Sequence, residues 1–260
     1  KGLFVGLTVV DIQYFVERFP SSNEKIKTEP PVLLVGGPAA NAAIACRFLG
    51  TQASLVTSLG QNHFESFIRS DFEKHNIQVF DQSHSLPINP VFATVVTTVQ
   101  NGDRTIISHM PPQVKLDSNF LNENDIAQYD FVLTDGFYPE IALPILQKAK
   151  QLGVPVIFDG GSWKPYLNEL LTMVDCAICS ANFTLPDSSN SDELIRSLHK
   201  LGIKYVAISR GQDSIVASDM IDVVEIEVPQ VQTCDTLGAG DILHGAFAHY
   251  FALNHSFAEA

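Results

Sequence analysis

The sequence has few cysteines and no long apolar run, and both absences restrict where the protein can work. No apolar stretch of the 260 residues approaches the roughly 20 that a membrane-spanning helix needs. The start of the chain, Lys1 to Val10, meets Asp11 without the small-residue cleavage site of a secretory signal. Four cysteines are too few for a disulfide scaffold of this size. We therefore expect a cytoplasmic protein without membrane contacts.

Basic residues are also scarce. Lysine and arginine total 16 against 29 acidic residues, and the net charge of −13 argues against binding to nucleic acid or to anionic membranes. A phosphate-bearing ligand is compatible with this charge, because backbone dipoles can create a local positive site on an acidic protein. Neither a G-x-G-x-x-G fingerprint nor a Walker A loop is present. Any nucleotide site must therefore use a different architecture.

The sequence does contain an alternation of short apolar runs and amphipathic stretches. With 45% hydrophobic residues, the chain can form a large α/β domain with a substantial core. The expected buried strands are Leu3–Val10, Phe131–Thr134, Val154–Phe158, Cys176–Cys179 and Tyr205–Ser209. The expected helices are Asn41–Leu49, Phe64–His75, Glu140–Leu152 and Asp192–Leu201. This alternation predicts a central, mostly parallel sheet flanked by helices on both faces.

Two segments, about 12–35 and 91–109, break this rhythm. The first has no helix signal, and the second alternates around Asn101-Gly102-Asp103. An Asn-Gly turn between extended runs is a strong hairpin signal. We expect a small β-sheet apart from the main one, which can cover a ligand site as a lid. Its edges can pair with a second copy in a homodimer or face solvent in a monomer.

The most informative stretch is Asp235-Thr236-Leu237-Gly238-Ala239-Gly240-Asp241, which an apolar helical run follows. A small-residue turn that opens a helix exposes unpaired backbone N–H groups with the helix dipole behind them, and such a turn suits an anion. Asp241 adds a carboxylate that can take a proton at the same place. Together they suggest a site where a hydroxyl is deprotonated beside a phosphoryl group. The alternative is that Asp241 only caps the helix.

Other polar residues stand at expected strand ends. Asp11, Asp135 and Asp159 each follow an apolar run, and ligands of open parallel sheets bind at the carboxyl ends of strands. These carboxylates can accept hydrogen bonds from a polyol, or each can cap the next element. Gly36-Gly37 makes a second glycine turn that opens a helix, and Asn41 offers both a donor and an acceptor there.

These features together resemble a known family. Gly36-Gly37-x-x-x-Asn41-Ala42-Ala43 and Asp235-Thr236-x-Gly238-Ala239-Gly240-Asp241 are similar to the two signatures of the PfkB/ribokinase family of carbohydrate kinases. The resemblance spans nearly the whole chain, and the first strand and Arg104-Thr105-Ile106 are most similar to the ketohexokinase-like branch. It implies a ribokinase-like α/β fold with a small β-sheet lid, with residues 1–260 forming a single kinase domain.

The resemblance implies roles for the residues of the second glycine motif. Asp241 is similar to the general base that takes the proton of a sugar primary alcohol as it attacks ATP. Gly238, Ala239 and Gly240 are similar to the anion hole that stabilises the transferring phosphoryl group.

The resemblance also implies substrate contacts. Asp11, Gly37 and Asn41 are similar to residues that bind sugar hydroxyls. Arg104, on the expected lid hairpin, is similar to an arginine that reaches the sugar or phosphate on closure, and its alternative is a solvated hairpin charge.

The nucleotide side departs from the family pattern. Asn182, Ser209 and Gly211 match nucleotide-binding positions, but Leu185 stands where many members have a glutamate and Ser214 replaces a glycine. The family implies Mg²⁺ with ATP, and some members use a monovalent cation near the position of Asp235; the metal ligands stay open here. These departures leave open a sugar- or nucleotide-binding protein that has lost transfer, and within the kinase class the alternative is a nucleoside kinase.

Overall fold

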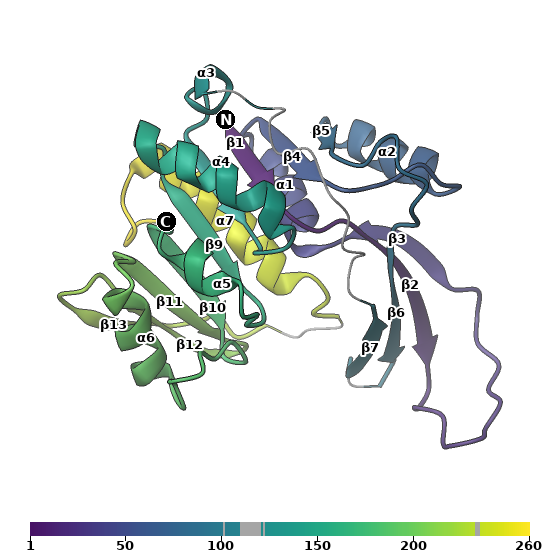
Figure 1. Cartoon of the computed structure of the whole chain (residues 1–260). Coiled ribbons are helices and arrows are strands. Elements are labelled where there is room, and N and C mark those ends of the chain that lie inside the picture. The colour runs from purple at the N-terminus through teal and green to yellow at the C-terminus, as the bar shows by residue number, and fades with distance from the viewer. Residues whose placement is uncertain (101, 110–120, 122, 232–234) are drawn as a thin grey trace.

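The computed structural model contains two β-sheets, the larger one covered by helices (Figure 1). It describes residues 1–100, 102–109, 121, 123–231 and 235–260. The strands of the main sheet are β1 (Gly2–Val5), β4 (Ala53–Thr57), β5 (Gln78–Asp81), β8 (Phe131–Thr134), β9 (Val156–Gly160), β10 (Cys176–Ser180), β11 (Tyr205–Arg210), β12 (Asp213–Ser218) and β13 (Val223–Ile226). The strands of the small sheet are β2 (Val9–Val16), β3 (Val32–Gly36), β6 (Val91–Thr98) and β7 (Arg104–Ser108). The helices are α1 (Pro38–Phe48), α2 (Glu65–Lys74), α3 (Glu123–Ile126), α4 (Pro139–Leu152), α5 (Leu167–Leu171), α6 (Ser191–Lys200) and α7 (Ala239–Asn254).

The main sheet has the order β13-β12-β11-β10-β9-β8-β1-β4-β5. Strands β11 to β5 in this order are parallel, and β12 and β13 are antiparallel additions at one edge. In the sheet, β4 and β5 lie on one side of β1, and β8 to β11 lie on the other. The strand order thus reverses at β1, and such a reversal places a ligand crevice outside the carboxyl ends of the strands.

Two apolar cores lie on the two faces of this sheet. Because strand side chains alternate between faces, Leu3 and Val5 belong to one core and Phe4 to the other. The first core includes residues of α4, α5 and α6, and the second includes residues of α1, α2 and α7. Burial on both faces explains why the central strands are continuously apolar.

The small sheet stands apart from the main one and has the order β3-β2-β6-β7 (Figure 1). The expected hairpin is confirmed, since β6 and β7 are antiparallel with Thr97 opposite Arg104; Asn101 of its turn lies outside the described residues. The expectation of one strand over Leu3–Val10 is wrong. The chain leaves the main sheet after Val5 and enters the small sheet at Val9, three residues before the expected segment.

The four long helices expected from periodicity are confirmed to within a few residues, as α1, α2, α4 and α6. The edge strands β5 and β13 were not expected, and neither were the inner strands β4 and β12. Cys176 and Cys179 are buried free thiols of β10, as a strand interpretation requires. None of the described helices has the length and hydropathy needed to cross a bilayer.

Candidate functional site

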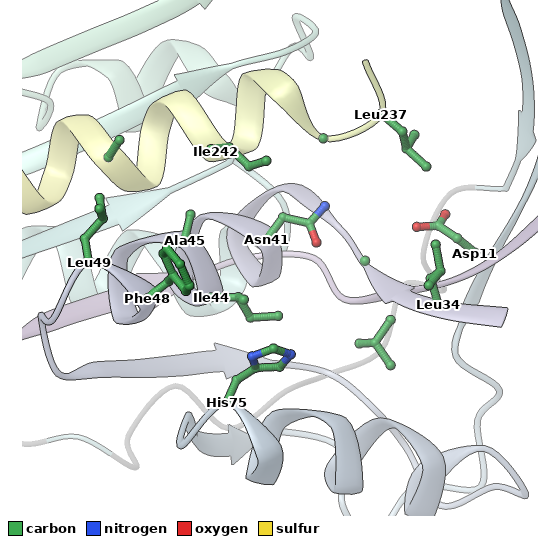
Figure 2. Close-up of a pocket in the computed structure, with 14 residues that line it drawn as sticks. Asp11, Leu34, Asn41, Ile44, Ala45, Phe48, Leu49, His75, Leu237 and Ile242 are labelled. Carbon is green, nitrogen blue, oxygen red and sulfur yellow. The ribbon is translucent and has the colours of Figure 1, made fainter. Parts of the chain in front are cut away.

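The site forms where the N-terminal ends of α1 and α7 lie next to each other, beside β1 and β8. Asn41, in the first turns of α1, donates a hydrogen bond from Nδ2 to Oδ2 of Asp241, in the first turn of α7, over 2.7 Å. In Figure 2 the Asn41 amide points toward α7, and Asp11 lies at the same end of the pocket. The fold therefore brings together two residues that are 200 positions apart in the sequence.

Asp241 is not the N-cap of its helix. Gly238 occupies that position with a φ of +72°, and no side chain caps the helix. Asp241 instead lies inside the first turn, and its carboxylate accepts from Asn41. Burial raises the pKa of Asp241, and the hydrogen bond from Asn41 opposes that rise. A carboxylate with a raised pKa is a better proton acceptor than an ordinary one.

Asp11 faces the same place from the small sheet. It lies inside β2, opposite Leu34 and Ala93, and not at the end of a main-sheet strand as expected. A side chain at Gly36 would collide with the Asp11 carboxylate, so a glycine is needed there. Burial, followed by the charge of Asp241, raises the pKa of Asp11 to about 6. Two carboxylates thus share one partly desolvated site.

The first glycine turn is held by a buried carboxylate. Asp135 accepts hydrogen bonds from the backbone amides of Leu7 (2.8 Å), Ala39 (3.1 Å) and Phe137 (3.0 Å). Gly37 lies between these contacts with a φ of +106°. The expectation that Asp135 contacts a polyol does not fit, because three amides already occupy its oxygens and its side chain is buried. Its role is to tie the ends of β1 and β8 to the start of α1.

Asp159 is likewise unsuited to a polyol. It lies within β9 and is 5% exposed, and its Oδ2 lies 3.4 Å from Nδ1 of His244 on α7. Sequence reasoning missed His244, because a lone histidine in an apolar helical run carries no signal of its own.

The second glycine turn has the features of an anion site. The amide of Ala239 donates to the carbonyl of Thr236 at 3.2 Å. Within the described part of the chain, the amides of Gly238 and Gly240 have no such backbone acceptor. The first amides of a helix lack intrahelical partners, and the positive end of the α7 dipole lies behind them. Of the three expected anion-hole residues, two therefore keep a free donor.

Asp235 connects this turn to the small sheet. It accepts hydrogen bonds from Gln13 Nε2 on β2 (3.0 Å) and from the amide of Leu237 (2.8 Å). Arg104 of β7 approaches its carboxylate at 3.9 Å. The structure thus places Arg104 at the site, against the loop that carries the anion turn, and not on an isolated hairpin tip.

The expected nucleotide residues lie at the carboxyl ends of β10 and β11. Asn182 follows β10, Ser209 lies at the end of β11, and Gly211 begins the turn to β12 with a φ of +66°. None of them lines the cavity of Figure 2. Leu185 packs into the core with 6% exposure, so it cannot replace the glutamate of the family motif. Among the described residues, no group of three or more acidic, histidine or cysteine side chains is arranged to hold a metal.

A cavity of about 610 Å³ opens at the site. Asp11, Asn41, Gly36 and Gly238 line one end, and the rest is lined by apolar side chains of α1, α7 and β3 together with His75, which follows α2 (Figure 2). The polar end is where the two helix N-termini meet. A concave apolar cavity with a few convergent polar groups is the usual form of a small-molecule site.

Comparison with known proteins identifies the family. The profile of the pfkB family carbohydrate kinases matches residues 2–260. The chain is a member of this family. It is 28% identical over 261 residues to a ribokinase from Arabidopsis thaliana, covering 94% of this chain and 68% of that one.

Solved structures agree with this assignment. A candidate ribokinase from Agrobacterium tumefaciens has a TM-score of 0.85 at 26% identity, over 97% of this chain and 84% of that one. Arabidopsis thaliana ribokinase complexed with ribose and ATP has a TM-score of 0.77 at 22% identity, over 99% and 88%, which supports the fold. The pfkB assignment confirms the expected ribokinase-like fold and a carbohydrate kinase; the ketohexokinase-like branch stays a prediction.

Proposed function

We propose that this pfkB-family kinase transfers the γ-phosphoryl group of ATP to a primary alcohol of a sugar, with Asp241 as the general base. The observation that carries the proposal is the pair of helix N-termini that joins Asn41 and Asp241 beside the glycine turn. A base, an oriented amide and unpaired backbone donors there meet the needs of phosphoryl transfer, which are positioning and charge stabilisation.

Each neighbour has a role in this proposal. Asp11 and Asn41 bind sugar hydroxyls, and Gly37 lets the substrate approach the backbone closely. The amides of Gly238 and Gly240 stabilise the transferring phosphoryl, with Ala239 shaping the turn. Asp241 takes the proton of the attacking hydroxyl while the hydroxyl oxygen forms a bond to the γ-phosphorus and ADP leaves.

The co-substrate is the MgATP complex, with Asn182, Ser209 and Gly211 on the nucleotide side. Bound Mg²⁺ supplies neutralisation of the phosphate charges, and it is usually held by phosphates and waters more than by a protein cage. We further predict a monovalent cation near Asp235. A comparison of the turnover rate in K⁺ with that in a large organic cation tests this prediction.

The small sheet acts as the lid. Arg104 reaches the phosphate or the sugar from β7, and its contact with Asp235 supports a closed arrangement. The face of the small sheet opposite to Asp11 carries exposed Leu33 and Ile107, which suits pairing with a second copy in a homodimer. Three described cysteines are free, which favours a reducing cytoplasm.

Replacing Asp241 by asparagine tests the base. Asp241→Asn removes the proton acceptor and keeps the shape, so kcat should fall by about 10²–10⁴-fold while sugar binding and thermal stability are retained. The matched control is Asp192→Asn, the same change in the first turn of α6, far from the site. Near wild-type turnover in Asp241→Asn contradicts the assignment.

A panel of acceptors tests the reaction class. ATP consumption is measured with aldoses, ketoses, sugar phosphates and nucleosides. Turnover with nucleosides alone favours a nucleoside kinase, and a thermal shift by sugars without any turnover favours a protein that has lost transfer.

A further inference from the structure

His244 lies one turn beyond Asp241 on α7 and is 4% exposed. Its ring is directed back under the anion turn, toward the carboxyl ends of β9 and β10. No role in sugar or nucleotide contact accounts for a buried histidine at this point. Its hydrogen bonds show what it does.

Both ring nitrogens face carbonyl oxygens. Nδ1 lies 2.6 Å from the carbonyl oxygen of Gly240, and Nε2 lies 2.9 Å from that of Ile178 on β10. A carbonyl oxygen only accepts, whereas a neutral imidazole has one donor and one lone pair. A neutral ring would therefore point its lone pair at an oxygen. The pattern is complete only when both nitrogens carry a proton.

Asp159 supplies the opposite charge. Its Oδ2 is 3.4 Å from Nδ1 of His244, and it is buried without a hydrogen-bond partner in the described chain. An isolated buried carboxylate is costly, and a buried imidazolium is equally so. Burial raises the pKa of Asp159, and the charge of His244 opposes this. A neutral imidazole can donate to only one of the two carbonyls, of Gly240 or of Ile178, so we assign an ion pair.

We propose that His244 is a positioning residue for phosphoryl transfer, an imidazolium that binds Gly240 of the anion turn to β10 and keeps Asp241 ionised as the base. The proposal rests on the role given to Asp241 above. In this proposal the His244–Asp159 pair provides a fixed cation next to the anion turn, where negative charge develops during transfer. Asp159 in turn keeps that cation charged within the core.

Several groups shift the pKa of Asp241. Asn41 from α1, His244 from α7 and Arg104 from β7 favour the ionised form of Asp241, whereas Asp135, at the end of β8, opposes it. The charge of Asp241 raises the pKa of Asp11 on β2 and also that of Asp159. The charge of Lys164 lowers the pKa of Asp159.

The pH dependence of kcat/KM distinguishes this role from simple packing. With MgATP and the sugar of highest turnover in the panel, His244→Asn and His244→Gln should move the acid limb to higher pH by about one unit. The limb reports the joint titration of the neighbouring carboxylates Asp11 and Asp241, and loss of the cation raises the pKa of Asp241. The matched control is His249→Asn on the same helix. That histidine is 9% exposed and contacts Thr51, so its loss should lower stability without moving the limb.

Asp159→Asn is the second variant, because it keeps the ring and removes the opposing carboxylate. Without that partner the buried imidazolium loses its proton, so the acid limb should move to higher pH, as in the His244 variants. An unmoved limb in the His244 and Asp159 variants, or an equal shift in His249→Asn, overturns the proposal.

A measurement on the unaltered protein needs no substrate. In ¹⁵N-histidine NMR at neutral pH, His244 should show protons on both ring nitrogens, and a single neutral tautomer overturns the assignment. The two proposals fail separately. Full activity of Asp241→Asn contradicts the assignment of Asp241 as the base. If Asp241→Asn is inactive but the pH profiles of the His244 variants are unshifted, only the role of the ion pair is contradicted.

Discussion

Replacing Asp11 by asparagine should stabilise the free protein. Burial and the neighbouring Asp241 raise the pKa of Asp11 from 3.8 to about 6, so the ionised side chain costs the native state free energy at neutral pH. A difference of about two pKa units corresponds to about 3 kcal/mol. Because Asp11 is only partly buried and solvent screens its charge, we expect about 1–2 kcal/mol. The asparagine has no charge to desolvate and nearly the same shape.

The pH dependence of this gain follows from the sign of the shift. Above pH 6 the native carboxylate is ionised and its cost is complete; as the pH falls toward 3.8, wild-type Asp11 takes a proton in the native state and the cost disappears. Urea unfolding at about pH 7.5 should therefore show Asp11→Asn more stable, and at about pH 4 the two proteins should be equal.

Asp219→Asn is the control of opposite sign. Backbone amides of Asp222 and Ile221 lower the pKa of Asp219, so its charge is favoured in the native state and its loss should not stabilise. No gain for Asp11→Asn at neutral pH, or an equal gain at both pH values, would refute the reasoning. Asp11→Asn should also weaken sugar binding, which would show that the site retains this carboxylate at a cost in stability.

Two further predictions concern residues whose roles the structure reassigned. Asp135→Asn should lower the free energy of unfolding by about 1–3 kcal/mol, because an amide group cannot accept from all three backbone donors; urea unfolding measures this, and wild-type stability would contradict it. Leu185→Glu, which restores the family's glutamate, should destabilise by about 3 kcal/mol or more and leave the Mg²⁺ dependence of turnover unchanged, since the position lies in the core. Higher Mg²⁺ affinity in that variant would contradict the second prediction.

The sequence was sufficient for the elements whose signals are local. The periodicity of α4 and α6, the Asn-Gly hairpin and the glycine turn before α7 each depend on neighbouring residues, and the structure has all of them. The strands β5, β12 and β13, at or next to the edges of the main sheet, were not predicted because their partial burial removes the continuous apolar pattern of the central strands. The first strand was merged with the start of the second, since Leu3–Val10 is a nearly continuous apolar run and only the structure shows the bend at Gly6 where the chain changes sheets.

The sequence by itself determined that a small-residue turn opens a helix beside a carboxylate, and that a second glycine turn exists near Asn41. Those are local chemical facts, and they were enough to suggest a family and a base. Only the tertiary structure decided which of the carboxylates share one site. Asp11 and Asp241 face each other, Asp135 holds backbone amides, and Asp159 pairs with His244. The physical reason is that burial and pairing depend on strand order and helix packing, which bring together residues that lie far apart in the chain.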